Sequence, residues 1–585
     1  MKRVLLSLAI VALGSMALAE PFVWPNAWTV AEPGEAVTGG TLRSYDVGDI
    51  RTFNPFVSAE STSATDQIMN GGASLLMLPP DSDVWQPYAA ESFEVSEDGR
   101  TIDMVLRDGI KWSDGTPVTV QDYFFRYQAE TDPDVGSNGF DSWFIGEEQI
   151  TVEITGENTL RFNFPQPDRT AFPVAAMLPA PDHILGEIYR EGGAEALQGV
   201  WGIETDPNET VWTNAWVPTQ LSPDERLILT RNPHFGEWNV DEQGNPLPYL
   251  DQLSYELVQD QDAALNLYLA GEIDTFSPRN LDDIGVINVA IQNGDIDATV
   301  IENASPVASS QFIVFNWNLA GDPDKQELFR NADFRRAMSH LVDREAMVEL
   351  VYGGTASPMW SNVYQVLDFW VNPDVPKFEY DPEAALELLA GLGYSRTNAN
   401  GILVNTAGDE LGFRIVTNSG NNQREQILQI FADAARDVGV DVDASAIDFN
   451  LMVEQLLTVD ENRPFEAILI GLTGGSRDWP FGVNVIPCGT NLHMWNQDPS
   501  GECLVPQGTL ATNLYYEGRQ TLDTEAAREI GFEIQNTLAS IQPVIFTVSP
   551  SAHYSWLDSV RGEHPPEFIS DLVGARETVL SFKTQ

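Results

Sequence analysis

Residues 101–128 read TIDMVLRDGIKWSDGTPVTVQDYFFRYQ and place a strand, two tight turns and a helix start in a fixed order. The first seven residues alternate between apolar and polar positions, which is typical of a half-buried strand. Asp108-Gly109 and Asp114-Gly115 predict the two turns, because glycine tolerates a positive φ and aspartate bonds to nearby backbone. The stretch therefore predicts a strand that is followed by two tight turns.

The second half of this stretch predicts a helix. Thr119 and Asp122 resemble a capping box in which Asp replaces the usual Glu, so the helix should begin here and carry Phe124 and Tyr127. Local chemistry alone fits a strand, turn and helix in any α/β protein.

The whole chain has 585 residues, too many for one compact core, so two or three domains are expected. It carries 87 acidic and 31 basic residues, a formal charge of −56. Such a surface repels phosphate backbones, which argues against nucleic-acid binding. Two explanations of the acidity stay open: adaptation to a salty medium, which is the commoner cause, and attraction of a cationic ligand.

The amino terminus predicts export. A short basic start is followed by the apolar run VLLSLAIVALGSMALA, and Ala17-Leu18-Ala19 fits a signal-peptidase site before Glu20. The run is short for a membrane span, and no cysteine near the cleavage point indicates a lipid anchor. We therefore expect a signal peptide over residues 1–19 and a soluble protein in the periplasm or another extracytoplasmic compartment.

The two cysteines, Cys488 and Cys503, lie in one loop-like stretch. In an exported chain this predicts a disulfide, stabilising by roughly 3 kcal/mol on loop-closure estimates. His493 between them leaves a metal site conceivable, but no fourth ligand stands at a usual zinc spacing, so we predict no metal.

Strand and helix patterns are mixed along the chain, which predicts an α/β or α+β fold with several sheets and no internal repeat. One helix is expected over residues 331–352, where apolar residues recur at helical spacing. No hydrolase elbow, nucleotide loop or zinc-protease motif is present, and the six histidines are scattered, so neither catalysis nor a cofactor is predicted. Several tryptophans stand in polar loops, which suits ligand recognition.

The order of the parts resembles a known family. The stretch AAESFEVSEDGRTIDMVLRDGIKWSDGTPVTVQDYFFRYQ is similar to the signature of the family 5 solute-binding proteins of ABC importers, the oligopeptide- and dipeptide-binding group. Further similar segments follow in the family's order: GGTLRSYDVGDIRTFNPF, ERLILTRNPHFGEW, YLAGEIDTF, FIVFNWN and NADFRRAMSHLVDREAMVELVYGG. They cover Gly39 to about Gly354, and weaker similarity continues to the end.

The resemblance implies a periplasmic-binding-protein fold of type II, with two lobes, three domains and a discontinuous domain I. The expected boundaries are a signal peptide (1–19), an extended segment (20–38), domain I (39–68, 206–304 and 547–585), domain II (69–205) and domain III (305–546). Ligand is expected between domains I and III, which hinge shut around it.

The resemblance also implies site residues. In peptide binders of this family an aspartate after the buried strand of domain III meets the ligand's amino group, and FEAILIGLTGGSRDWP places Asp478 there. A turn aspartate that only caps backbone N–H groups is the alternative. The loop Ser58, Ala59, Glu60 and Ser61 matches the segment that pairs with peptide backbone. The aromatic wall is expected from Phe449 and Trp479, with Trp495 and Trp317 as further candidates.

The expected function is capture of a peptide by a monomeric protein for delivery to the permease subunits of an ABC importer. The sequence departs from the peptide binders in two places: Leu472-Thr473-Gly474-Gly475 lacks their tryptophan, and CGTNLHMWNQ is unlike the usual end of that loop. The family also includes oligosaccharide binders, and an oligosaccharide ligand stays open as the alternative. An unrecognised secreted hydrolase is the alternative from another class.

Overall fold

The computed structural model describes residues 21–24, 36–48, 50–57, 63–79, 84–474, 476–562 and 578–584. The predicted signal peptide and the predicted ligand loop at 58–61 lie outside these ranges, as does most of the expected extended segment. In the described part of the chain, no helix combines the length and apolarity needed to cross a bilayer.

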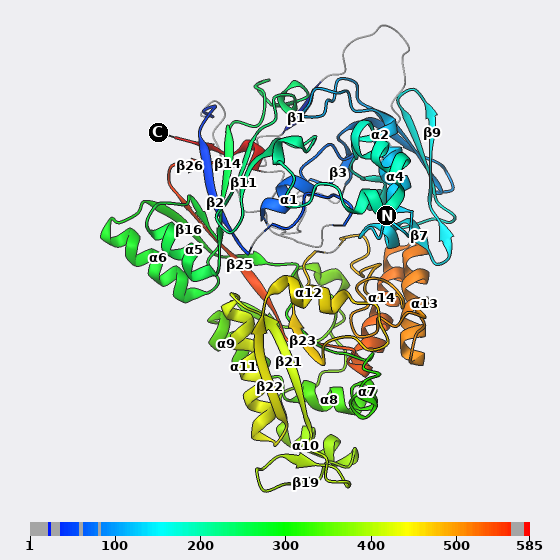
Figure 1. The fold of residues 1–585 in the computed structure, drawn as a ribbon, viewed down its shortest axis with the longest axis vertical. Coiled ribbons are helices and arrows are strands. Elements are labelled where there is room, and N and C mark those ends of the chain that lie inside the picture. Colours follow the sequence, from blue (N-terminus) through cyan, green and yellow to red (C-terminus); the bar gives the residue numbers. More distant parts are fainter. Residues whose placement is uncertain are drawn as a thin grey trace.

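The molecule has two lobes, each with its own hydrophobic cores (Figure 1). The first lobe, upper in Figure 1, has a large core from residues 24–255 and 560–582 and a small one from 264–300. The second lobe has two cores, both drawn from residues 308–548. Two bodies that move against each other must each have a core of their own, as these lobes do.

The first lobe is built on three sheets. Its central four-stranded sheet has the order β11 (Trp216–Ser222), β12 (Arg226–Arg231), β14 (Gln252–Val258), β2 (Thr41–Val47), with β2 parallel to β14. The second, antiparallel, has the order β5 (Ala90–Val95), β6 (Thr101–Leu106), β10 (Thr159–Asn163), β9 (Thr151–Gly156). In the third, β25 (Val548–Leu557) lies between β15 (Thr275–Phe276) and β16 (Ala298–Pro306).

The second lobe is built on one five-stranded sheet. Its order is β22 (Asp441–Ile447), β21 (Gly412–Asn418), β23 (Ala467–Ile470), β17 (Phe312–Phe315), β24 (Val544–Phe546). β21 is parallel to β22 and β23, whereas β17 is antiparallel to both of its neighbours. All four residues of β23 and of β17 are buried, as expected for central strands covered on both faces.

Two chain segments connect the lobes, residues 307–311 and 547–550, and they hydrogen-bond to each other. Gln311 N–H donates to the Val548 carbonyl (2.9 Å), and Thr547 N–H donates to the Gln311 carbonyl (2.8 Å). β25 continues from the second segment into the first lobe and pairs at its far end with β15 and β16. The lobes thus share a paired, two-strand connection, the usual geometry of a hinge.

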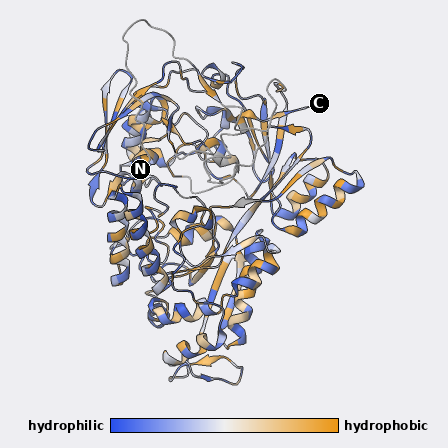
Figure 2. Cartoon of the chain, turned by 180° about the vertical axis from the view of Figure 1, so that it is seen from behind, coloured by the Kyte–Doolittle hydropathy of each residue, from blue (hydrophilic) through white to orange (hydrophobic). Residues whose placement is uncertain are grey.

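Helices cover the sheets and carry both polar and apolar residues along their length (Figure 2). Those of the first lobe are α1 (Ser63–Met69), α2 (Val120–Glu130), α3 (Ala171–Ala175), α4 (Glu187–Gln198), α5 (Gln261–Leu269) and α6 (Leu281–Asn293). Those of the second lobe are α7 (Pro323–Arg330), α8 (Ala332–His340), α9 (Arg344–Tyr352), α10 (Pro382–Gly391), α11 (Asn422–Asp437), α12 (Phe449–Leu457), α13 (Pro506–Gln520) and α14 (Thr524–Ile541).

Short strands pair in twos around these sheets, or with β25 in the case of β18. They are β1 (Phe22–Trp24), β3 (Leu76–Met77), β4 (Gln86–Pro87), β7 (Phe144–Ile145), β8 (Glu148–Gln149), β13 (Asn239–Asp241), β18 (Ala356–Pro358), β19 (Arg396–Thr397), β20 (Leu403–Val404), β26 (Val560–Arg561) and β27 (Phe582–Lys583).

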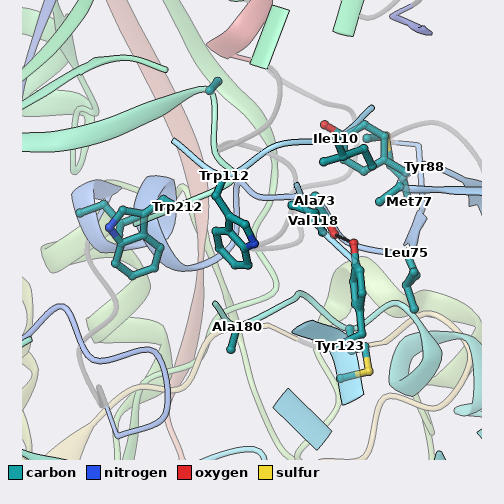
Figure 3. Packing of buried hydrophobic residues seen from close by; sticks show 14 of the residues in the cluster. Ala73, Leu75, Met77, Tyr88, Ile110, Trp112, Val118, Tyr123, Ala180 and Trp212 are labelled. Carbon is teal, nitrogen blue, oxygen red and sulfur yellow. Dashed lines mark hydrogen bonds between the residues drawn. The ribbon is translucent and has the colours of Figure 1, made fainter. Parts of the chain in front are cut away.

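The stretch that opened the sequence analysis has the predicted structure. β6 is followed by turns in which Gly109 and Gly115 have φ of 87° and 88°. Thr119 and Asp122 form the predicted capping box at the start of α2. Figure 3 shows how this stretch packs into the core, where the Tyr123 hydroxyl donates to the Ala73 carbonyl (2.6 Å).

The prediction of one helix over 331–352 is wrong, because the segment forms two helices, α8 and α9. Asp343 marks the break between them: its side chain accepts a hydrogen bond from Ala346 N–H (2.9 Å) and caps α9. Apolar spacing is nearly the same on both sides of the break, so periodicity alone could not separate the helices, whereas the capping aspartate could have.

Candidate ligand-binding site

Two adjoining cavities lie between the lobes, with volumes of about 440 Å³ and about 530 Å³. Both are lined by Ser142, Pro173 and Val174 from the first lobe and by Ser476 from the second. We call the first the inner cavity, because most of its lining belongs to the second lobe, and the other the outer cavity. Cavities of this size between two bodies are typical ligand sites.

The inner cavity is lined by aromatic rings and by uncharged polar groups. The polar groups are Asn138, Ser142, Thr170, Ser310, Asn362, Thr473, Ser476 and Asn484. The rings are Phe312, Tyr364, Trp479, Phe481, Tyr515 and Phe546. Among the lining residues described, the single charged side chain is Arg519, which is paired with Asp168.

Trp479 forms part of the wall of the inner cavity, where the sequence predicted an aromatic residue. The indole is only 2% exposed and packs against Phe481 (ring centroids 4.4 Å apart), Trp370 and Tyr515. Its benzene edge lies over Gly518 of α13, whose missing side chain leaves room for it. These contacts, all within the second lobe, hold the ring in its orientation.

Asp478 lies where the lobes meet. Its carboxylate accepts a hydrogen bond from the Trp85 indole (3.4 Å), and its carbonyl accepts one from the Arg169 guanidinium (3.1 Å). Both partners belong to the first lobe. Trp85 lines the outer cavity, as do the residues just before Asp478, so the aspartate stands at the border of that cavity.

The other predicted aromatic residues lie further from the inner cavity or behind it. Phe449 begins α12 and is 37% exposed; its neighbour Asp448 pairs with Arg51 of the first lobe (3.3 Å). Trp317 is buried in the second lobe and stacks under the Arg335 guanidinium. Trp495 is buried and lines a separate cavity of about 30 Å³.

The predicted disulfide between Cys488 and Cys503 is present and closes the loop that carries His493. His493 is buried, its ring centroid is 4.0 Å from that of Trp495, and its Nδ1 donates to the Val485 carbonyl (3.0 Å). Burial lowers the pKa of His493 to about 4. The imidazole therefore acts as a neutral packing group behind the inner cavity wall.

This burial predicts acid sensitivity. Between pH 6.5 and about 4 the unfolded imidazole binds a proton that the folded one does not, so stability falls as pH falls through this range. The expected loss attributable to His493 is about 3 kcal/mol by pH 4. Thermal unfolding of His493→Phe across this range should show a smaller drop than the parent protein. The same substitution at His340 is the control, and an equal drop in all three proteins would contradict the prediction.

Several lining residues were not predicted from the sequence. Asn138, Ser142 and Thr170 come from the first lobe, and Asn362 and Asn484 from loops of the second. They are ordinary polar loop residues, and no spacing or motif distinguishes them. Only the folding of distant segments brings them together.

A family model described as bacterial extracellular solute-binding proteins, family 5, matches residues 84–491. A probable ABC transporter-binding protein of Deinococcus radiodurans is 40% identical over the full length of both chains. The oligopeptide-binding protein AppA of Bacillus subtilis is 24% identical over 90% of each chain.

Solved structures of similar fold include complexes with bound solutes. AppA in complex with a nonapeptide has a TM-score of 0.78, with 21% identity, over 94% of this chain and all of that one. The periplasmic binding protein MelB of Agrobacterium fabrum, in complex with stachyose, has a TM-score of 0.81, with 20% identity, over 96% of this chain and 87% of that one. These likenesses confirm the predicted mixed α/β fold of periplasmic-binding-protein type.

Proposed function

The chain belongs to the bacterial extracellular solute-binding proteins of family 5, and on that premise we propose that it captures a peptide between its two lobes and delivers it to the permease of an ABC importer. It acts by binding and not by catalysis, as a monomer in the periplasm or its equivalent. The signal peptide predicted for residues 1–19 would bring it there.

The observation that carries the proposal is the position of the two cavities. Both are bounded by both lobes, and the lobes are joined by a paired hinge, so a solute in the cavities would touch groups that meet only when the lobes close. Adjoining cavities of about 440 and 530 Å³ favour an elongated solute over a single small one. The similarity to AppA supports a peptide.

Within this proposal Asp478 binds the amino group of the peptide. Its carboxylate stands at the edge of the outer cavity beside Trp85, and a charge-assisted hydrogen bond to an ammonium would offset the desolvation of both groups. Ser58, Ala59, Glu60 and Ser61 are proposed to pair with the peptide backbone, and Trp479 and Phe449 to contact its side chains, with Trp495 and Trp317 in supporting positions.

Asp478→Asn is expected to weaken binding of peptides with a free amino terminus by about 1.5–3 kcal/mol, because the amide keeps the shape but removes the charge. Isothermal titration with matched free and N-acetylated nonapeptides measures this. The parent protein should prefer the free peptide, and the variant should bind both alike. An unchanged preference in the variant would exclude the amine-binding role while leaving peptide capture intact.

An oligosaccharide is the second candidate, favoured by the chemistry of the inner cavity. Its amide and hydroxyl groups and its aromatic rings suit a neutral, hydroxyl-rich ligand, and Arg519, the one charged side chain among its described lining residues, is already paired. The likeness to MelB, which was solved with stachyose, points the same way.

Titration of the purified protein against a nonapeptide pool and against tetrasaccharides separates the two candidates. Peptide binding with no response to sugars supports the proposal, and the reverse result replaces it with the oligosaccharide. Product analysis of the same mixtures tests the hydrolase alternative, since a solute-binding protein returns both pools unchanged.

A further inference from the structure

A buried ion pair joins the lobes beside the inner cavity. Asp168 lies in the first lobe, in the loop between β10 and α3, and Arg519 lies in the second lobe, in the last turn of α13. Arg519 Nε is 2.9 and 3.0 Å from the two carboxylate oxygens of Asp168, and Nη2 is 2.7 Å from Oδ2. The two side chains are 0% and 1% exposed.

Both charged groups make further hydrogen bonds at this position, and each guanidinium nitrogen of Arg519 has a partner. Oδ1 of Asp168 also accepts from the Thr170 N–H (2.8 Å) and the Thr170 hydroxyl (2.9 Å). Arg519 Nη1 also donates to the Phe144 carbonyl (2.9 Å), a second contact from α13 to the first lobe. Phe144 is in β7, which lies beside α13 in Figure 1. A buried ion pair is more favourable when neighbouring groups also hydrogen-bond to its charged atoms, as Thr170 and Phe144 do here.

The next residue of the same loop extends the contact. Arg169 donates to the carbonyls of Asp478, Thr521 and Leu522 and to the Thr524 hydroxyl, all in the second lobe, at 3.1–3.2 Å. Its backbone N–H donates to the Arg519 carbonyl (2.9 Å). Residues 168 and 169 therefore place a carboxylate against Arg519 and a guanidinium against backbone carbonyls, all in the second lobe.

The contacts that Asp168 and Arg169 make with the second lobe are lost when the lobes separate. Asp168 and Arg519 would then each be hydrated, so the pair exists only in the closed arrangement. If one partner is neutralised, closure buries the other charge without compensation, which is strongly unfavourable. If both are neutralised, no unpaired charge is left and closure is far less affected.

We propose that Asp168 and Arg519 are positioning residues for solute capture, whose ion pair shifts the protein towards the closed arrangement whichever solute is bound. This inference rests on the proposed function, in which the lobes open and close around the solute. The pair adjoins the inner cavity through Thr170 and Arg519, so lobe closure and the shape of the cavity are set by the same contact.

Spin labels on exposed positions of the two lobes, Ile154 in β9 and Leu386 in α10, report the lobe separation by electron–electron resonance without added solute. Introduced cysteines can be labelled selectively, because both native cysteines are in the disulfide. Asp168→Asn and Arg519→Gln should each lower the ratio of closed to open molecules about 100-fold. The double variant should lie closer to the parent protein than either single variant.

The matched control is Asp103→Asn. Asp103 pairs with Arg161 through two hydrogen bonds of 2.7 and 2.8 Å, but within the first lobe and at the exposed surface, so its loss should leave the lobe separation unchanged. Single variants with the parent's distance distribution, even at a lower melting temperature, would overturn the inference. Because no solute is needed, failure to bind peptide would count against the proposed function alone.

Discussion

Replacing Arg335 by alanine is expected to lower the free energy of unfolding of the second lobe by about 3–5 kcal/mol. Arg335 is in α8; its side chain is 1% exposed and lies against the carboxyl end of α14. It donates to the carbonyls of Ile541 (2.7 and 3.0 Å), Gln542 (2.9 Å) and Phe329, and its guanidinium stacks over the Trp317 ring at 4.4 Å. Alanine would leave these buried carbonyls without a donor and open a cavity beside the indole.

The neighbouring residue is the matched control. Arg336 also donates to a carbonyl at the end of α14, that of Ser540 (2.8 Å), but its side chain is 32% exposed, so water can replace it. Arg336→Ala should cost about 1 kcal/mol. Denaturant unfolding followed by tryptophan fluorescence compares the two. Equal losses would show that burial at Arg335 is not the source of its contribution.

Gly518→Ala is expected to displace Trp479 and to reduce affinity for the solute at least about tenfold, or 1.4 kcal/mol. A Cβ at this position would lie 2.1, 2.5 and 2.9 Å from three atoms of the indole ring, closer than any real contact. The helix backbone cannot move away without disturbing α13, so the ring must rotate out of the wall of the inner cavity. Overpacking of this kind also costs about 1–3 kcal/mol of stability.

Gly508, ten positions earlier in the same helix, provides the control. A Cβ there would lie 3.4 Å from the Cys488 sulfur, which is ordinary van der Waals contact. Gly508→Ala should therefore bind solute as the parent does and gain up to about 1 kcal/mol from helix propensity. The prediction fails if Gly518→Ala binds solute with the parent's affinity in the same titration.

Local features of the fold could be predicted because their causes lie within a few residues. The alternation in β6, the glycines with positive φ and the capping box of α2 depend only on neighbouring atoms. The disulfide was predicted from two cysteines in one loop of a chain whose amino terminus predicts export. The break between α8 and α9 was missed although Asp343 signals it, because the apolar spacing continues on both sides.

The site could be predicted only in part, because it is assembled from distant segments. Asp168 and Arg519 are 351 positions apart, and nothing near either residue indicates the other. Tryptophans in polar loops proved an ambiguous signal: Trp479 lines the inner cavity, whereas Trp317 and Trp495 pack within the second lobe. An indole beside polar residues in the sequence can be buried as readily as it can face a ligand, since packing decides its place.

The most direct test of the account is mass spectrometry of the solute released by mild denaturation from protein purified out of the exported fraction. A closed two-lobed protein retains its solute through purification when dissociation is slow. The account predicts a set of short peptides with free amino termini. A series of masses spaced by hexose units, with no peptides, would contradict it and assign the inner and outer cavities to an oligosaccharide.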